Sequence, residues 1–446
     1  MLTGRPGEPS LAKPTFPSDP AVQVPLQAAG AGAGRAPLWL AAAALLVCVG
    51  YLAAELFLLG RLGFPLDDSW IHLQFARNLA AGEGLAYNPG ELVTGSTAPL
   101  WTALLALLFW LPGDVVAWTK LAGVALHLIG VDATWRLARE LGLGRGLAAL
   151  AAGLTLATGP LAWSAVSGME IPLFIALSLW GMILHLRERA SPGAAALSFA
   201  VLALGALARP EGLLLLALAG LDRLLVFRRA AQAAGDESSG EPAAIDGEPA
   251  GLALARPPLR PLLTGAALAA CVLAGPILVY AWAGGSVLPT TFAVKAGTSR
   301  NWMPEARLLF DILGILWRPQ PVAALLAASG VLALVERLGT PRDRGLLPAL
   351  WLIGLPLVYS AMSPGGDKLI AGNFGRYYFP LFPPLLVLAA LALERAWLAL
   401  GSGVRLGRLW LPLRALLVAL LAAPTLLVLV QGAGRYVQNV ANVEDS

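Results

Sequence analysis

The sequence predicts an all-α integral membrane protein that crosses the bilayer many times. Only 13% of its 446 residues are charged and 57% are hydrophobic, whereas a soluble domain carries about 25% charged residues. The mean hydropathy is +0.71, and several apolar runs reach the roughly 20 residues needed to cross a hydrocarbon layer of about 30 Å. These observations exclude a soluble protein with an unusually apolar core.

The apolar runs divide the chain into two halves. Residues 1–36 are rich in Pro, Gly and Ala and lack a signal-peptide core, which predicts a disordered cytoplasmic leader. A polar stretch at 229–260 predicts a flexible cytoplasmic linker between membrane halves at 37–228 and 261–431. The clear runs are 37–60, 147–165, 261–283, 377–398 and 409–431; shorter ones are 170–187, 193–208, 212–227, 320–338 and 346–362.

Arginine placement predicts the orientation, because short loops rich in Lys and Arg stay on the cytoplasmic side. The N-terminus is then inside, a tail at 432–446 is outside, and about eleven crossings lie between them. Two apolar segments, 97–112 and 115–135, do not fit this parity. We therefore expect one of them, with 97–112 the shorter candidate, to be re-entrant or tilted at the interface. The arginines that set the orientation are Arg136, Arg139, Arg145, Arg187, Arg189, Arg223, Arg228, Arg229, Arg337, Arg342, Arg344, Arg395, Arg405 and Arg408.

The loop at 61–96, after the first apolar run, contains the richest polar segment. Asp67 and Asp68 stand near its beginning, and residues 69–81 are predicted as a short helix whose apolar side chains recur every four positions. Such a helix lies flat on a membrane surface. Two adjacent carboxylates at this junction are costly without a purpose. They predict either helix capping with solvation, or a general base or cation site.

The whole loop carries a family resemblance. The run from Asp67 to Trp101, DDSWIHLQFARNLAAGEGLAYNPGE…TGSTAPLW, resembles the first extracytoplasmic loop of C-type (GT-C) membrane glycosyltransferases and looks closest to the mycobacterial arabinofuranosyltransferase branch. The resemblance covers most of residues 60–440. The tail resembles the beginning of a soluble domain that often follows in such relatives, which predicts a truncated chain. Four further stretches resemble the same branch in the same order: SGMEIPLF (167–174), ARPEGLLL (208–215), LPTTFAVKAG (288–297) and FGRYYFPLFPPLL (374–386).

The resemblance implies a GT-C bundle on the bacterial plasma membrane that transfers a sugar with inversion on the extracytoplasmic face. The implied donor is a polyprenyl-phosphate sugar and the implied acceptor a cell-envelope glycan or glycolipid. The sequence has no glycine-rich phosphate fingerprint, which argues against a nucleotide-sugar donor. By the resemblance Asp67 is the general base, and Asp68 orients the acceptor or helps to hold a divalent cation (Mg, Mn or Ca). No other cofactor is expected.

A lipid-phosphate leaving group also needs cationic partners. Lys295 and Lys368 fall in loops assigned outside, against the charge bias, and together with Arg376 they are the expected phosphate ligands. Ordinary solvated loop charge remains the alternative for the lysines. Arg376 followed by Tyr377 also fits an interfacial anchor.

The other candidates for substrate contact are charged groups at predicted outer helix ends. Glu170 contacts sugar or metal, or caps the next helix. Arg209 and Glu211 flank a proline and are expected to form an ion pair that braces the site. His72 and Arg77, on the predicted short helix, complete the set.

A transporter or flippase of lipid-linked sugars is the main alternative function, and an inactive membrane scaffold is a third. A transporter predicts charged or broken helices near the bilayer midplane, whereas the conspicuous charges here fall in outer loops. The net charge of +4 comes from arginines beside membrane segments and does not suggest a nucleic-acid partner.

Overall fold

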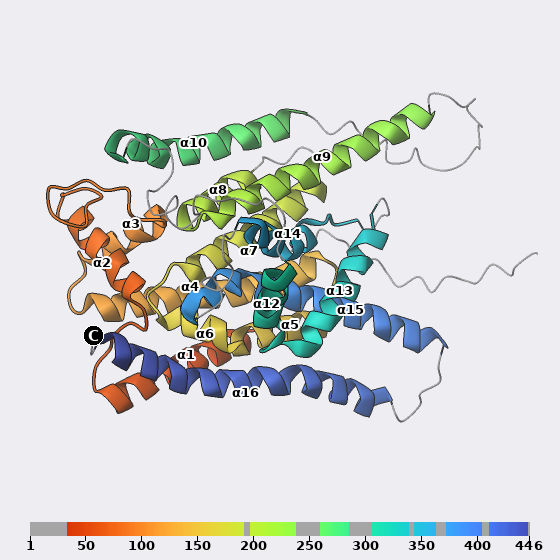
Figure 1. Ribbon diagram of the computed structural model, residues 1–446. Coiled ribbons are helices and arrows are strands. Elements are labelled where there is room, and N and C mark those ends of the chain that lie inside the picture. Colours follow the sequence, from red (N-terminus) through yellow and green to blue (C-terminus); the bar gives the residue numbers. More distant parts are fainter. Residues whose placement is uncertain are drawn as a thin grey trace, which may run out of the picture. The chain divides into compact units, whose positions relative to one another are not determined.

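The computed structural model describes residues 34–190, 197–237, 259–284, 306–338, 343–362, 372–403 and 410–444. These residues are almost entirely helical, and the only extended pairing among them is a single bridge between Ala86 and Leu92. The all-α prediction is therefore confirmed. Figure 1 shows the helices, which in chain order are α1 (Leu38–Leu59), α2 (Asp67–Ala80), α3 (Pro99–Leu108), α4 (Val115–Glu140), α5 (Arg145–Ala157), α6 (Gly159–Val166), α7 (Ile171–Ala190), α8 (Leu197–Ala208), α9 (Glu211–Glu237), α10 (Leu259–Gly284), α12 (Ala306–Trp317), α13 (Pro321–Glu336), α14 (Leu347–Met362), the 3-10 helix η1 (Gly372–Leu381), α15 (Phe382–Gly403) and α16 (Trp410–Glu444).

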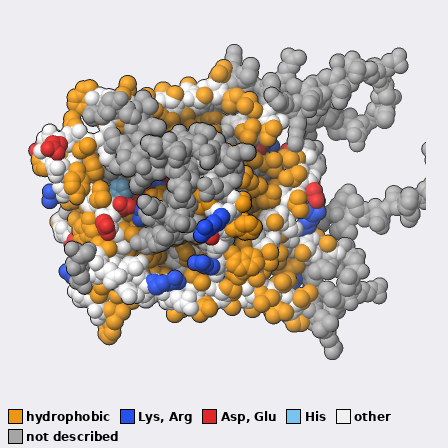
Figure 2. Space-filling model, viewed as in Figure 1, with side chains coloured by type: hydrophobic (Ala, Val, Ile, Leu, Met, Phe, Trp, Pro, Cys, Tyr) orange, Lys and Arg blue, Asp and Glu red, His pale blue; other side chains and the backbone are white. Residues whose placement is uncertain are grey.

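Six of the described helical segments are long and apolar enough to cross a membrane, by length and composition. Two bent pairs, α5 with α6 (57°) and α12 with α13 (112°), raise this number to eight if each pair counts as one span. The multi-pass prediction is thus confirmed, whereas the count of about eleven is not. Figure 2 shows hydrophobic side chains over most of one face, with charged side chains gathered into a few groups. The six segments are Leu38–Leu59, Val115–Glu140, Ile171–Arg189, Pro261–Trp282, Gly375–Ala399 and Leu411–Val443.

The two segments that broke the predicted parity differ in length. The helix in the first, α3, has only 10 residues, whereas α4 has 26. By length, α4 is the candidate span and α3 is too short to cross alone.

The predicted linker and tail partly coincide with helix. Helix α9 continues to Glu237, so the predicted linker begins in helix and its residues 238–258 lie outside the described part. Helix α16 continues to Glu444, through most of the predicted tail.

The loop after α1 contains the predicted short helix, α2. Two of its polar side chains hold the chain reversal that follows: Asn78 donates to the carbonyls of Ala86 and Tyr87, and Gln74 donates to the carbonyl of Tyr87. The turn after α2 contains Gly82, whose φ of 85° favours glycine. The hydrogen bonds and the turn together return the chain to α3, which packs against α2 (Figure 1).

The core is built on helices that approach closely. Helices α7 and α15 are the most enclosed spans, and α13 packs along α15. At that contact Gly330 lies so near α15 that a Cβ added to it would stand 2.0 Å from the carbonyl oxygen of Leu388. A side chain of any size there must push two backbones apart.

We predict that Gly330→Ala lowers stability by about 1–3 kcal/mol, because overpacking a close helix contact costs this much. Thermal unfolding of purified protein in detergent measures the loss. Gly50→Ala on α1 is the matched control, since a Cβ there meets nothing within 4 Å. Equal melting temperatures for the two variants would show that the α13–α15 contact yields without cost.

Candidate functional site

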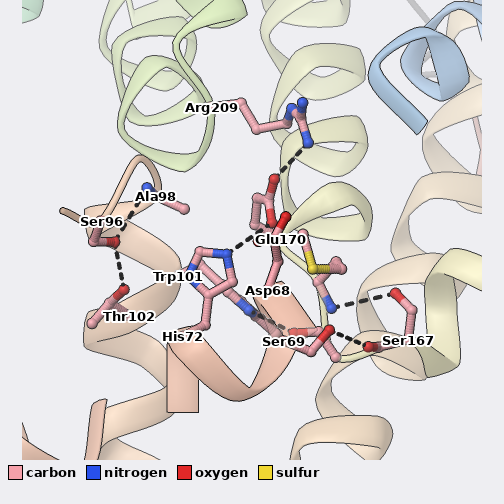
Figure 3. A network of polar contacts seen from close by, with 12 residues as sticks. Asp68, Ser69, His72, Ser96, Ala98, Trp101, Thr102, Ser167, Glu170 and Arg209 are labelled. Atoms are coloured by element: carbon pink, nitrogen blue, oxygen red, sulfur yellow. Dashed lines mark hydrogen bonds and ion pairs between the residues drawn. The ribbon is translucent and has the colours of Figure 1, made fainter. Parts of the chain in front are cut away.

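The candidate site forms where three helix beginnings meet. Helix α2 begins at Asp67, α7 begins directly after Glu170, and α9 begins at Glu211. Side chains at these beginnings contact one another and η1. Figure 3 shows Glu170 between Arg209 and His72, with Asp68 close by.

A buried chain of charges runs through Arg209. Its Nη1 donates to Oε1 of Glu170 at 2.5 Å, and its Nη2 and Nε donate to the two carboxylate oxygens of Glu211 at 2.7 and 3.3 Å. The hydroxyl of Tyr359 on α14 donates to Oε1 of Glu211 at 2.6 Å. All three charged residues are at least nine-tenths buried. The predicted pairing of Arg209 with Glu211 is present, and Glu170 shares the same guanidinium.

The ionisation of Glu170 is governed by this chain. Burial alone raises the pKa of the Glu170 carboxyl, but the charge of Arg209 and, after it, the contact with His72 lower it more. The net pKa therefore lies well below the ordinary range for glutamate. Glu170 is a fixed anion and not a proton donor at neutral pH.

His72 reaches the same carboxylate from α2. Its Nε2 lies 3.3 Å from Oε2 of Glu170, and the side chain is only 8% exposed. Its Nδ1 is buried and has no hydrogen-bond partner among the described residues. A buried polar atom without a partner is costly, so Nδ1 is available to a molecule that enters the site.

Arg376 of η1 forms an ion pair with Asp68 of α2. The Arg376 side chain is 7% exposed and the Asp68 side chain is 39% exposed, so Asp68 lies at the solvent-exposed edge of the cluster. The ring of Tyr377 lies under both arginines, with its centroid 4.9 Å from Cζ of Arg209 and 5.6 Å from Cζ of Arg376. These distances are typical of cation–π contacts.

Hydrogen bonds to the 167–170 loop fix the relative position of the two carboxylate-bearing loops. Ser69 Oγ donates to the carbonyl of Ser167 at 2.7 Å, and Trp101 Nε1 donates to the carbonyl of Gly168 at 3.0 Å. Gly168 has a φ of 78°, and a Cβ on it would stand 2.5 Å from the ring of Phe64. Glycine is therefore required both by the backbone and by the contact.

The structure brings together most, but not all, of the predicted site residues. Asp68, His72, Glu170, Arg209, Glu211, Arg376 and Tyr377 form one connected group. Asp67 begins α2 beside this group, is exposed, and has no hydrogen bond or ion pair with another described side chain. Arg77 is exposed on the last turn of α2 and makes no side-chain contact with this group. Lys295 and Lys368 lie outside the described residues.

Three contacts of the site were missed by sequence reasoning. Ser69 and Trp101 lie within the stretch that carries the resemblance, which was a usable signal. Tyr359 lies in an uninterrupted apolar segment, and no local pattern distinguishes it from a packing residue.

A divalent cation does not fit the described residues. In the described ranges no group of three His, Cys, Asp or Glu side chains is placed so that it could hold a metal ion. The carboxylates of the group already have cationic partners, Arg376 for Asp68 and Arg209 for Glu170 and Glu211.

Comparisons with known proteins bear on the resemblance. No family model matches the chain. Over 210 residues (44% of the chain) it is 31% identical to the terminal beta-(1->2)-arabinofuranosyltransferase of Mycobacterium tuberculosis, and it spans about a third (32%) of that relative's length. The predicted resemblance to the arabinofuranosyltransferase branch is confirmed over this alignment.

Two crystal structures share the fold. ArnT of Cupriavidus metallidurans aligns with a TM-score of 0.52 at 15% identity, covering 89% of this chain and 76% of its own. An oligosaccharyltransferase of Archaeoglobus fulgidus aligns with a TM-score of 0.51 at 13% identity, covering 89% and 56%. At these identities the likeness concerns the fold alone, and it confirms the predicted GT-C-like helical bundle.

The lowered pKa of Glu170 predicts a pH dependence of stability. A carboxyl whose pKa is lowered by folding stabilises the protein above its ordinary pKa of about 4.3, and this contribution is lost as pH falls further, toward the folded pKa. Glu170→Gln should therefore lower stability by about 2 kcal/mol, the scale of a hydrogen bond to a charged group. The difference from wild type should stay constant between about pH 7 and pH 5 and narrow only below the ordinary pKa.

Thermal unfolding of both proteins across this pH range measures the difference. Glu91→Gln is the control, because Glu91 is exposed and its carboxylate accepts a hydrogen bond from the exposed side-chain amide of Asn88. A difference that disappears between about pH 7 and pH 5 would mean that Glu170 is not held as an anion.

Proposed function

We propose that this chain is a membrane glycosyltransferase that moves a sugar from a polyprenyl-phosphate donor to a cell-envelope glycan or glycolipid, with inversion. The observation that carries the proposal is the pairing of Asp68 with Arg376 beside Asp67, which has no side-chain partner among the described residues, at a junction of helix beginnings in a GT-C-like fold. The alignment with an arabinofuranosyltransferase supports the same activity. The chain spans only a third of that relative, so donor sugar and acceptor are not carried over from it.

The proposed chemistry assigns the two aspartates different roles. Asp67 takes the proton from the acceptor hydroxyl as its oxygen attacks the anomeric carbon. Attack from the face opposite the leaving group inverts that carbon, and the bond between carbon and phosphate oxygen breaks. The electron pair leaves with the polyprenyl phosphate. The exposure of Asp67 and its lack of a described partner support its role as the base.

The donor phosphate needs cationic contacts, since negative charge develops on it as it leaves. Arg376 is nearly buried at the cluster and offers a guanidinium fork suited to phosphate oxygens. Nδ1 of His72, which has no partner among the described residues, is proposed as a second polar contact. Lys295 and Lys368 are proposed to complete the phosphate site. Arg77 is proposed only to contact a substrate that extends along α2.

We propose that the site faces the outside of the membrane. Helix α7 begins beside Glu170 and ends at the basic residues Arg187 and Arg189. Its 20 residues span about 30 Å, the thickness of a hydrocarbon layer. The basic end is the one expected to stay in the cytoplasm, which leaves Glu170 at the outer end.

A transporter or flippase is not favoured. Two bent helix pairs and a buried charge pair, Glu55 with Lys120, meet part of what a transporter predicts. However, the aligned relative and one of the two structural neighbours are named as transferases. The cluster of opposite charges also lies at helix beginnings and not within helix centres.

We predict that sugar transfer depends on Asp67. Wild type in membranes supplied with a panel of polyprenyl-phosphate sugars should transfer one of them, and Asp67→Asn should reduce the rate by about 10²–10⁴-fold, as expected for loss of a general base. Asp114→Asn is a matched control: Asp114 is exposed and caps α4 through its side chain, and asparagine caps equally well. Transfer that survives Asp67→Asn at an unchanged protein level would move the base to another residue.

We also predict opposite effects on donor binding for the two members of the Asp68–Arg376 pair. If the phosphate competes with Asp68 for Arg376, then Asp68→Asn should tighten binding of a polyprenyl phosphate by about tenfold, or about 1.4 kcal/mol. Arg376→Gln should weaken binding by at least as much. Competition against a labelled polyprenyl phosphate measures both, with Asp67→Asn as a control for the loss of one negative charge. Weaker binding by Asp68→Asn would contradict the competition.

A further inference from the structure

A second polar cluster is buried next to the loops that carry the site carboxylates. It consists of Glu55 on α1, Lys120 on α4 and Tyr436 on α16, which we call the buried ion-pair cluster. Their exposures are 0%, 1% and 0%. Lys120 Nζ donates to Oε2 of Glu55 at 3.0 Å and to the hydroxyl of Tyr436 at 2.5 Å. The Tyr436 hydroxyl also lies 2.9 Å from Oε2 of Glu55.

The cluster contacts the backbone of both loops that carry the site carboxylates. Oε1 of Glu55 accepts the N–H of Gly63 at 2.6 Å, four residues before Asp67. The carbonyl of Val166, four residues before Glu170, lies 3.0 Å from Lys120 Nζ and 3.1 Å from the Tyr436 hydroxyl. One buried ammonium thus reaches one loop directly and the other through Glu55.

The surroundings leave the two loops little freedom to move apart. One turn along α4 from Lys120, a Cβ on Gly123 would stand 2.2 Å from the carbonyl of Ala165, so α4 lies directly on the end of α6. The ring of Phe64, in the first loop, has its centroid 5.3 Å from Lys120 Nζ. Its edge also contacts Gly168 of the second loop. The ammonium therefore occupies the junction of the loops.

Burying a charge pair at this depth is costly, and an apolar pair of similar volume packs helices at least as well. What an apolar pair cannot supply is hydrogen bonds to Gly63 N–H and Val166 C=O. The strength of these two hydrogen bonds depends on the direction between donor and acceptor, whereas apolar packing has no such dependence. They fix the first loop relative to the second, and hence Asp67 and Asp68 relative to Glu170.

We propose that Lys120, with Glu55 and Tyr436, is a positioning group for the proposed transferase, setting the separation between the Asp67–Asp68 pair and the Glu170–Arg209 pair. This inference rests on the proposed function. The proposal makes α16 part of the positioning group, because the hydroxyl of Tyr436 on α16 contacts Glu55 and the carbonyl of Val166. A displacement of about 1 Å far from the chemistry can reduce the rate by about 100-fold.

The experiment compares two buried tyrosines on the same helix interface. Tyr436→Phe removes a hydroxyl that contacts Val166 and Glu55 while leaving the charge pair in place. Tyr51→Phe is the matched control: Tyr51 is 3% exposed, its ring packs on Tyr436 at 5.6 Å, and its hydroxyl donates to the Leu429 carbonyl of α16, without contact to either loop. Lys120→Met is the more direct change, but it leaves Glu55 buried without its cation and can prevent folding.

Two readouts are taken on purified, folded protein. In the transfer assay, Tyr436→Phe should lower kcat by about 10- to 100-fold with little change in KM, whereas Tyr51→Phe stays within about twofold of wild type. In hydrogen exchange, Tyr436→Phe should raise exchange in peptides covering 61–66 and 166–170 but not in α13 and α15. Tyr51→Phe should leave both loops unchanged.

Equal losses in the two variants would overturn the proposal, because the cluster would then serve only to dock α16. Wild-type behaviour of Tyr436→Phe in both readouts would overturn it as well. If wild type transfers no sugar, the proposed function fails and hydrogen exchange alone tests the positioning role. Raised exchange in both loops of Tyr436→Phe, but not of Tyr51→Phe, supports that role. No difference between the two variants refutes it.

Discussion

The guanidinium of Arg209 is the charge on which the arrangement of the site depends. A buried cation in a membrane protein must be surrounded by partners, because an unpaired one costs several kcal/mol. The partners of Arg209 come from separate segments: Glu170 before α7, Glu211 at the start of α9, and the ring of Tyr377 in η1. Tyr359 extends the contact to α14 through Glu211. Satisfying one charge therefore brings four segments together, and the position of His72 against Glu170 adds α2 as a fifth.

Two neighbouring aspartates acquire different surroundings through helix geometry. Successive residues of an α-helix point about 100° apart. Because α2 already begins at Asp67, Asp68 is turned toward Arg376, whereas Asp67 remains exposed. The sequence shows only a repeated residue type. Asp68 is paired with Arg376, whereas Asp67 has no described side-chain partner, and this difference arises from the residue at which α2 begins.

The sequence predicted what depends on local pattern. Long apolar runs became helices, and Arg209 and Glu211, two residues apart, became an ion pair. The bend of 57° between α5 and α6 was not predicted, although Gly159 and Pro160 at the break are a local signal for it, because a proline cannot continue a helix. The pairing of Arg376 with Asp68 joins residues 308 positions apart. Such a contact depends on the tertiary fold and leaves no local signal, and the same holds for Glu55, a single acid inside an apolar run.

The meeting of three helix beginnings has a consequence for the electrostatics of the site. Each α-helix carries a partial positive charge of about half an elementary unit at its N-terminus, from aligned peptide dipoles. Helices α2, α7 and α9 each place an acidic residue at or just before that end, Asp67, Glu170 and Glu211. Part of the positive potential around these carboxylates is therefore supplied by the backbone, which no side-chain substitution removes. The attraction of negative charge to this junction is in this sense a property of the backbone arrangement.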